Sequence, residues 1–432
     1  GGRASNLIIE DSSRSDAPSL CFDSGAQFIA VTDPRFEGLL QSPVMKGLLP
    51  QWKGRFGILG RSGQVLPRET VMTSRVMRKP RPTEEQQIPP TPDDDDDDNF
   101  FRMLEGEETV LRTGANGVGG LCEAICARTS VECIYGANVT SIHLEEGRMG
   151  FLGKWHVNAV PITRTTSDPR TISPTPTIPT EPFDAIVLSN HDPSLAADII
   201  DGLLKTSRVA TLGGGGVGHQ PTREVVAQFV EQLRMAAASR RSLFSLMIAY
   251  DRPLHEVAFD GVSLHGSDII HFLARDSSKP GLGRSDGREC WTAVSSQPFA
   301  DWMDEEWRIA VAGGRGDVAR NRPSLNKEET AMAAAVHEER AREIMMGEFE
   351  SRLGTFFPHR NMPSPVFSKA QRWDAASFNP IGLDEDNEAV TFHPWGLAVC
   401  GDYLGTRQGG LQEAALSGLR AASDVSSWLV QP

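Results

Sequence analysis

Hydrophobic and polar positions alternate between strand-like and helix-like spacing along most of the chain. Short apolar runs rich in β-branched and aromatic residues predict strands. We expect these at 21–30, 138–144, 155–157, 183–188, 242–250 and 269–274. Apolar positions at helical spacing predict helices at 121–127, 193–204 and 331–353. Strands interleaved with helices indicate a mixed α/β architecture.

The C-terminal segment carries the clearest single unit. Residues 396–400 form an apolar run, as expected of a strand buried on both faces, and Gly401-Asp402 ends it. From Leu411 to Leu429 apolar residues recur every three or four positions, which is the period of one helix face. The glycines before this helix allow close approach of a ligand, and its first turn offers N–H groups with partial positive charge. An ordinary strand–helix turn is the alternative reading.

Three segments have the composition of surface insertions: 79–99, 160–182 and 211–219. The first two are rich in Pro and in charged or hydroxyl residues, so they bury too little apolar surface to offset their ordering entropy. The third holds Gly213–Gly216 but lacks a P-loop lysine and the dinucleotide spacing, which indicates a linker. The glycines at 113–120 are not read as a nucleotide fingerprint either, because no clear strand precedes them.

Composition and charge narrow the function classes. The 432 residues bury a sizeable core, with 39% hydrophobic and 23% charged residues. The net charge of −14 includes the run Asp93–Asp98, and no basic face is evident, which argues against nucleic acid as a partner. No apolar run approaches the ~20 residues of a membrane span. We therefore expect a soluble intracellular protein, cytoplasmic or organellar, with the compartment and oligomeric state left open.

The six cysteines form no CxxC pair, and the histidines form no triad, so we expect buried thiols in a reducing compartment and no metal. The chain opens on Gly1-Gly2 without an initiator Met. The true N-terminus is therefore expected to be absent, and any targeting segment is unreadable.

An ordered set of short motifs resembles the FAD-dependent amine oxidase superfamily, and within it the renalase-like NAD(P)/FAD-dependent oxidoreductases. The resemblance runs from Gly1 to about Val425, broken by the three insertions. The motifs are Gly1-Gly2-Arg3, Phe22-Asp23-Ser24-Gly25-Ala26-Gln27-Phe28, Asp33–Phe36, Asn138–Ile142, Asp184–Leu188, Asp276-Ser277-Ser278-Lys279-Pro280, Trp291–Ser295, Arg372-Trp373, Gly401-Asp402, Gly409-Gly410 and Ser417-Gly418.

The resemblance implies a Rossmann-like FAD-binding domain interleaved with an α+β substrate domain built on a mixed sheet. The FAD-binding domain would comprise 1–30, 105–205 and 390–432, and the substrate domain 31–104 and 206–389. The family's Gly-x-Gly-x-x-Gly loop sits in an N-terminal βαβ unit, and nothing precedes Gly1. The FAD-binding domain is therefore expected to be N-terminally truncated.

Site residues follow from the same resemblance. It implies that an arginine contacts the cofactor phosphate and that a Gly-Ala-Gln strand lies beside the flavin. It also implies that a valine backbone holds the adenine. The remainder of the cofactor would contact the strand end at Gly-Asp and the start of the following helix. The implied cofactor residues are Gly1, Gly2, Arg3, Gly25, Ala26, Val139, Gly401, Asp402, Gly410, Leu411 and Gln412. The implied substrate residues are Gln27, Trp291 and Trp373, where the two tryptophans could wall one pocket. Ordinary core packing is the alternative reading for each tryptophan.

Two polar residues have ordinary structural readings at this stage. Lys279, in a polar loop, is expected to be exposed to solvent. Asp192 is expected to cap the helix that follows it rather than to form a catalytic dyad with His191. No acid or base is assigned, since the flavin carries the redox step in this class.

The implied activity is hydride transfer to flavin N5 from a small amine or a dihydronicotinamide-like substrate, with O2 as the acceptor. Two alternatives stay open. One is a non-catalytic or incomplete fragment of such a flavoprotein that does not retain FAD. The other is a different amine-oxidase-like flavoenzyme that acts on a carotenoid, a porphyrin or a polyamine.

Overall fold

The chain divides into two compact units in the computed structural model. Unit 1 comprises Gly1–Ile125 and Arg241–Ala376, and unit 2 comprises Cys126–Arg240 and Ser377–Pro432. The predicted assignment of residues to a cofactor domain and a substrate domain stays a prediction. The structure describes residues 3–10, 18–71, 109–145, 153–162, 181–206, 222–312, 327–359, 361–383, 388–406 and 410–429.

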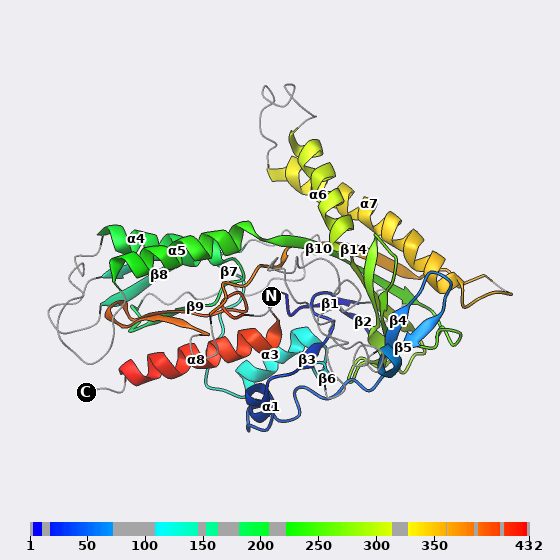
Figure 1. The fold of residues 1–432 in the computed structure, drawn as a ribbon, viewed down its shortest axis with the longest axis horizontal. Coiled ribbons are helices and arrows are strands. Elements are labelled where there is room, and N and C mark those ends of the chain that lie inside the picture. The colour runs from blue at the N-terminus through cyan, green and yellow to red at the C-terminus, as the bar shows by residue number, and fades with distance from the viewer. Residues whose placement is uncertain are drawn as a thin grey trace, which may run out of the picture. The chain divides into compact units, whose positions relative to one another are not determined.

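Unit 1 is built on a seven-stranded mixed sheet (Figure 1). The β4 and β11 strands run parallel, whereas the pairs β10–β13, β12–β13, β11–β12 and β4–β5 are antiparallel. In spatial order the strands are β14 (Phe367–Ser377), β10 (Arg241–Tyr250), β13 (Glu289–Ser295), β12 (Ile270–Arg275), β11 (Gly261–Leu264), β4 (Phe56–Leu59) and β5 (Val65–Pro67).

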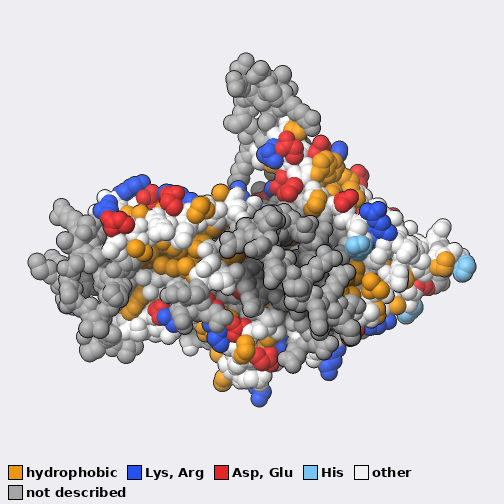
Figure 2. Space-filling view, viewed as in Figure 1, with side chains coloured by type: hydrophobic (Ala, Val, Ile, Leu, Met, Phe, Trp, Pro, Cys, Tyr) orange, Lys and Arg blue, Asp and Glu red, His pale blue; other side chains and the backbone are white. Residues whose placement is uncertain are grey.

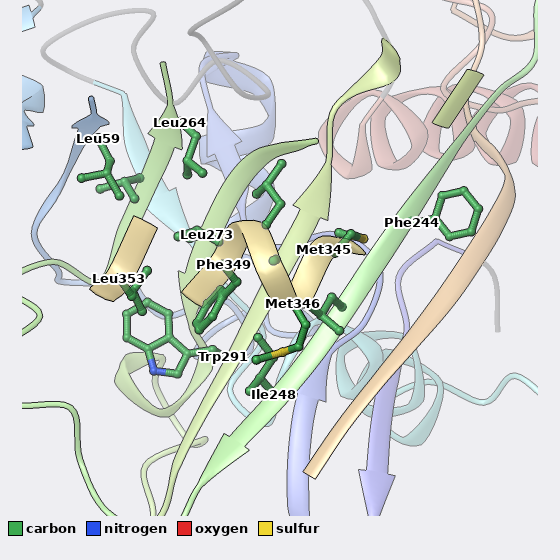
Figure 3. Close-up of a cluster of buried hydrophobic side chains, with 14 of the residues drawn as sticks. Leu59, Phe244, Ile248, Leu264, Leu273, Trp291, Met345, Met346, Phe349 and Leu353 are labelled. Atoms are coloured by element: carbon green, nitrogen blue, oxygen red, sulfur yellow. The ribbon is translucent and has the colours of Figure 1, made fainter. Parts of the chain in front are cut away.

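One face of this sheet packs under two helices, α6 (Gln297–Ala312) and α7 (Lys327–Gly354). Because side chains alternate along a strand, one set of β10 and β13 residues points into this core. Figure 3 shows Ile248 and Trp291 from the sheet meeting Met345, Met346 and Phe349 of α7. This apolar layer is the largest described core of the unit.

The opposite face of the sheet packs against the N-terminal strands. The antiparallel pair β1 (Asn6–Ile9) and β2 (Leu20–Asp23) contributes Leu20 and Phe22, which contact Met247 and Ala249 of β10. Three shorter elements of unit 1 follow them in the chain: β3 (Ile29–Val31), α1 (Pro34–Leu40) and β6 (Val110–Arg112). The helix α3 (Val118–Ala127) begins in unit 1 directly after a glycine-rich turn.

Unit 2 combines a hairpin, a small sheet and three helices. In the small sheet, β16 (Leu397–Val399) lies between β15 (Val390–Phe392), which is antiparallel, and β9 (Ile186–Leu188), which is parallel. The hairpin is β7 (Ala137–Glu145) with β8 (Lys154–Pro161), and the helices are α4 (Pro193–Thr206), α5 (Arg223–Ala238) and α8 (Leu411–Leu429). Both signs of charge line the outer sides of α4 and α5 (Figure 2), where Asp201 pairs with Lys205 and Arg234.

Most predicted elements are present within one to four residues at each end. Two differences stand out. The strand predicted at 21–30 is two strands, β2 and β3, separated by a turn at 24–28. The strand β6 directly precedes the glycine-rich turn where none was expected, because three residues carry too little periodicity to detect.

Several predicted segments lie wholly or partly outside the residues that the structure describes. The segments 79–99 and 211–219, and residues 163–180 of the second insertion (160–182), lie outside the described residues, while Val160 and Pro161 end β8. Of the six cysteines, Cys290 and Cys400 are buried and Cys122 is exposed, so the expectation of uniformly buried thiols is wrong. Within the described ranges, no helix is long and apolar enough to cross a bilayer.

Candidate functional site

A buried lysine, Lys279, joins a cluster of buried polar side chains in unit 1. Lys279 follows the short 3-10 helix η2 (Asp276–Ser278), and only 2% of its surface is exposed. Its Nζ lies 2.9 Å from Asp23 Oδ2 and 2.7 Å from Asp276 Oδ1, and it donates to Gln27 Oε1 at 3.2 Å. The expectation that Lys279 is solvent-exposed is therefore wrong.

Both carboxylates of this cluster have further partners. Asp23 Oδ1 accepts the backbone N–H of Val118 at 2.8 Å, and Asp276 Oδ2 accepts the Thr292 hydroxyl at 2.5 Å. The side chains of Asp23 and Asp276 have no exposed surface. A buried charge is tolerated only when it is paired and hydrogen-bonded, and this cluster meets both conditions.

Two carboxylates around one ammonium leave an excess of negative charge in a buried place. Burial raises the pKa of Asp276 to about 6; Lys279 opposes this shift and the neighbouring Asp23 adds to it. Burial alone would lower the pKa of Lys279, but Asp23 and Asp276 outweigh it and hold that pKa above its ordinary value. Lys279 is therefore charged at neutral pH, and Asp276 takes up a proton in milder acid than an ordinary aspartate does.

The cluster fixes the Asp23–Gln27 turn, which comprises the last residue of β2 and the first four residues of the connection to β3. Gln27 Nε2 donates to the carbonyls of Asp23 at 2.5 Å and Gly25 at 2.9 Å. Trp373 Nε1 donates to the carbonyl of Ser24 at 2.9 Å. Gln27, predicted to contact substrate, is only 2% exposed and uses both ends of its amide within the protein. Its role toward a substrate stays a prediction.

The glycine-rich turn before α3 is held by the same cluster. The N–H of Val118 is bonded to Asp23, and the N–H of Gly119 is bonded to Asn6 Oδ1 at 2.6 Å. Helix N-termini bind phosphate through such N–H groups. Here two of them are already bonded to side chains of the protein, and β6 pairs antiparallel with β3 rather than starting a parallel βαβ unit. The geometry agrees with the sequence reading that 113–120 is no nucleotide fingerprint.

The two predicted substrate tryptophans lie on opposite faces of the seven-stranded sheet. Trp291 has no exposed surface and packs against Phe349 in the core under α7 (Figure 3). Trp373 bonds Ser245 Oγ at 3.1 Å on the other face, where Thr292 meets Asp276. The prediction that both wall one pocket is wrong, because Trp291 points into the core under α7 and Trp373 lies on the opposite face. Both faces of β13 are buried, so its sequence does not show which face Trp291 takes.

Trp52 is the aromatic residue that the sequence analysis missed. Its ring centroid is 5.2 Å from Lys279 Nζ, and its Nε1 donates to Ser278 Oγ at 3.0 Å. A cation above an aromatic face is stabilised by the ring quadrupole. No local motif marks Trp52, so only the three-dimensional structure identifies it as part of the cluster.

The C-terminal unit has the predicted strand–turn–helix form. β16 is fully buried, Asp402 is 6% exposed directly after it, and α8 begins at Leu411. The Gly401 N–H donates to Ser417 Oγ at 2.9 Å, which joins the strand end to α8. A side chain at Gly401 would come within 2.5 Å of the Tyr403 ring, so glycine is required there by the protein's own packing.

The other predicted cofactor residues are divided between the units. Gly1 and Gly2 lie outside the described residues. In unit 1, the N–H of Gly25 is bonded to Ser5 O and that of Ala26 to Arg3 O, at 3.2 and 2.8 Å. In unit 2, Val139 is 48% exposed on β7, Gln412 is 3% exposed in the first turn of α8, and Gly410 precedes that turn. That they form one cofactor site stays a prediction.

Solved structures share this fold across nearly the whole chain. A protein assigned as a protoporphyrinogen oxidase, from Exiguobacterium sp. 255-15, has a TM-score of 0.50 at 11% identity, covering 100% of this chain and 91% of that one. A redesigned variant of putrescine oxidase has a TM-score of 0.50 at 11% identity, covering 99% and 91%. No family model matches the chain, and neither does any curated protein. The predicted α/β fold class with a mixed-sheet domain is confirmed.

Proposed function

We propose that the chain is an FAD-dependent oxidoreductase of the renalase and amine-oxidase type. The observation that carries the proposal is the C-terminal unit, a buried strand ending in Gly401-Asp402 and followed by the 19-residue helix α8. The oxidase fold of the whole chain supports it.

The chemistry of these residues fits a flavin dinucleotide. Asp402 is a buried carboxylate that can accept hydrogen bonds from sugar-like hydroxyls. The first turn of α8, with Leu411 and Gln412 after Gly410, carries the positive end of a long helix, which suits electron-rich carbonyl oxygens. Arg3, Gly25, Ala26 and Val139 are proposed to complete the site, as the family resemblance implies.

Bound FAD would supply the redox chemistry, accepting a hydride at N5 from a small amine or a dihydronicotinamide-like substrate, with O2 as the proposed final acceptor. The protein's part is to bind and orient both molecules and to exclude water. Asp402 would hold the cofactor, and the Asp23–Gln27 turn and Trp373 would face the flavin ring, as the family resemblance implies.

Absorbance of the purified chain tests the proposal directly. We expect a yellow protein with a flavin band near about 450 nm, either as purified or after incubation with FAD and gel filtration. A chain that stays colourless under both conditions contradicts the proposal and favours the alternative, a binding module that retains no FAD.

Replacing Asp402 tests the residue on which the cofactor proposal depends most. We expect Asp402→Ala to weaken FAD binding by about 1.5–3 kcal/mol, roughly ten- to a hundredfold, because a charged hydrogen-bond acceptor is lost. FAD titration by fluorescence quenching measures this change. Asp424→Ala on α8, which breaks the surface pair with Arg420, is the control and should leave FAD affinity unchanged.

The substrate class is tested by hydrogen peroxide release. Dihydronicotinamide isomers and small monoamines are the proposed substrates. Putrescine and protoporphyrinogen belong in the same panel because two proteins of this fold are named for them. Peroxide with only the latter two would move the assignment to another branch of the superfamily.

A further inference from the structure

The buried Lys279 cluster needs an explanation other than stability. Taking an ion pair out of water costs several kcal/mol per ion, and replacing such groups by apolar residues is often neutral or stabilising. Asp23, Asp276 and Lys279 each have 0% side-chain exposure, so none of them can touch a substrate from solvent. A buried charged network instead holds the backbone segments that carry it at fixed distances from one another.

The contacts of this cluster join three backbone segments that are far apart in the sequence. Lys279 bonds the side chains of Asp23 and Gln27 at the two ends of the β2–β3 turn. Asp23 in turn bonds the start of α3 at Val118. Gly281, two residues after Lys279, packs so closely on the turn before α3 that an added Cβ would lie 1.6 Å from the Ala115 carbonyl oxygen.

The sheet provides the fixed reference for this arrangement. Asp276 forms an ion pair with Lys279 and accepts a hydrogen bond from Thr292, which lies in the middle of β13. On the far side of the turn, Trp373 of β14 holds the Ser24 carbonyl. The Asp23–Gln27 turn is therefore connected to two strands of the sheet, through Lys279 and Asp276 on one side and through Trp373 on the other.

We propose that Lys279 and Asp276 are positioning residues that set the conformation of the Asp23–Gln27 turn and, through it, the environment of the flavin ring beside that turn. The flavin part of this inference rests on the proposed function. The conformational part stands on the described contacts alone, and the two parts are tested separately.

Hydrogen exchange tests the conformational part in the full chain, with or without FAD. In Lys279→Met, we expect amide exchange to accelerate at least roughly tenfold at 23–28 and 113–119, while β10 and α7 keep their protection. Arg352→Met is the matched control: Arg352 is also a buried cation, 6% exposed, paired with Glu348 at 2.7 Å on α7. Its loss should act on α7 and leave 23–28 unchanged. Unchanged exchange at 23–28 in Lys279→Met overturns the proposal.

A second variant keeps the test decisive if Lys279→Met does not fold. Thr292→Val keeps the volume and all three charges and removes only the hydroxyl that orients Asp276. We expect the same two segments to exchange faster by a smaller factor. No change in either segment overturns the role of Asp276.

Flavin readouts test the second part on the FAD-loaded protein. We expect Lys279→Met and Asp276→Asn to shift the visible circular dichroism of the flavin and to slow its reduction by N-benzyl-dihydronicotinamide at saturating FAD. The Arg352→Met control should match the wild type in both measurements. If the wild type takes up no FAD, the proposed function fails while the exchange experiment still decides the conformational claim. Normal flavin spectra and reduction with faster exchange at 23–28 would contradict the flavin part alone.

Discussion

Gly281 shows how closely two backbones approach in unit 1. It has φ +78°, and an added Cβ would meet the Ala115 carbonyl oxygen at 1.6 Å. Gly287 has the same φ of +78° but open space around its Cα. The two positions therefore share the cost of a left-handed backbone and differ only in crowding.

This pair separates backbone strain from steric overlap. We expect Gly287→Ala to lower the free energy of unfolding by about 1 kcal/mol, the usual cost of a left-handed non-glycine residue. Gly281→Ala should cost several kcal/mol, since a backbone carbonyl must move. Urea denaturation measures both. Equal losses in the two variants would show that the turn before α3 moves aside freely.

His337, on helix α7, is a buried titratable residue on the face of the seven-stranded sheet that α6 and α7 cover. It is 8% exposed, its Nε2 donates to the Met303 carbonyl at 2.7 Å, and its ring contacts Phe244 and Trp307. Burial lowers the pKa of His337 below its ordinary value, although the Met303 carbonyl opposes the shift. The folded state therefore binds this proton less readily than the unfolded state does.

The sign of the resulting pH dependence follows from linkage. Below the ordinary histidine pKa of about 6.5 the unfolded state binds more protons, so this residue lowers stability as the pH falls from 7 toward 5. We expect His337→Phe, which keeps the aromatic contacts, to lose less stability over that range than the wild type. Thermal unfolding at several pH values measures the difference, and parallel curves for the two proteins would contradict the assignment.

At the scale of single residues, the sequence predicts motifs better than it predicts partners. The motifs identify the Asp-x-Gly-Ala-Gln and Ser-Ser-Lys-Pro segments, but they do not predict that Lys279 bonds Asp23, 256 positions away. A lysine is exposed by default, and only its partners reverse that default. The sequence also does not predict which face of the sheet Trp291 occupies, because all seven residues of β13 are buried.

Among the elements, helix α4 has a starting point that the sequence fixes through Asp192 and Pro193. Pro193 occupies the first helical position, and Asp192 Oδ1 accepts the Ser194 N–H at 2.9 Å, which confirms the predicted N-cap. We expect Asp192→Ala to lower stability by about 1 kcal/mol. Asp198→Ala, in the exposed middle of the same helix, is the control and should be neutral or slightly stabilising. Equal effects of the two variants on the thermal midpoint would argue against the cap.

Long elements with strong periodicity were predictable, and short ones were not. The strand β10 and the helices α4, α7 and α8 match their predicted ranges closely, since each has many positions that share one period. The turn at 24–28 was missed because it is held by side chains of distant elements rather than by turn residues. Tertiary contacts decide such segments, and no local pattern encodes them.

For the whole molecule, the fold class was predictable, but the pairing of strands was not. Alternating strands and helices predict an α/β protein, and the fold that the chain shares with two solved structures confirms that class. The order β14-β10-β13-β12-β11-β4-β5 depends on pairs far apart in the chain, such as β4 with β11. Sequence alone carries no register for such pairs.

The ion pair between Asp23 and Lys279 can form only after both residues have been synthesised. Unit 1 is interrupted by the stretch 126–240 of unit 2, so Asp23 is translated 256 residues before its cation. At roughly 5–20 residues per second, this delay is on the order of ten to fifty seconds. Residues 126–240 of unit 2 are therefore synthesised before unit 1 can complete its polar centre.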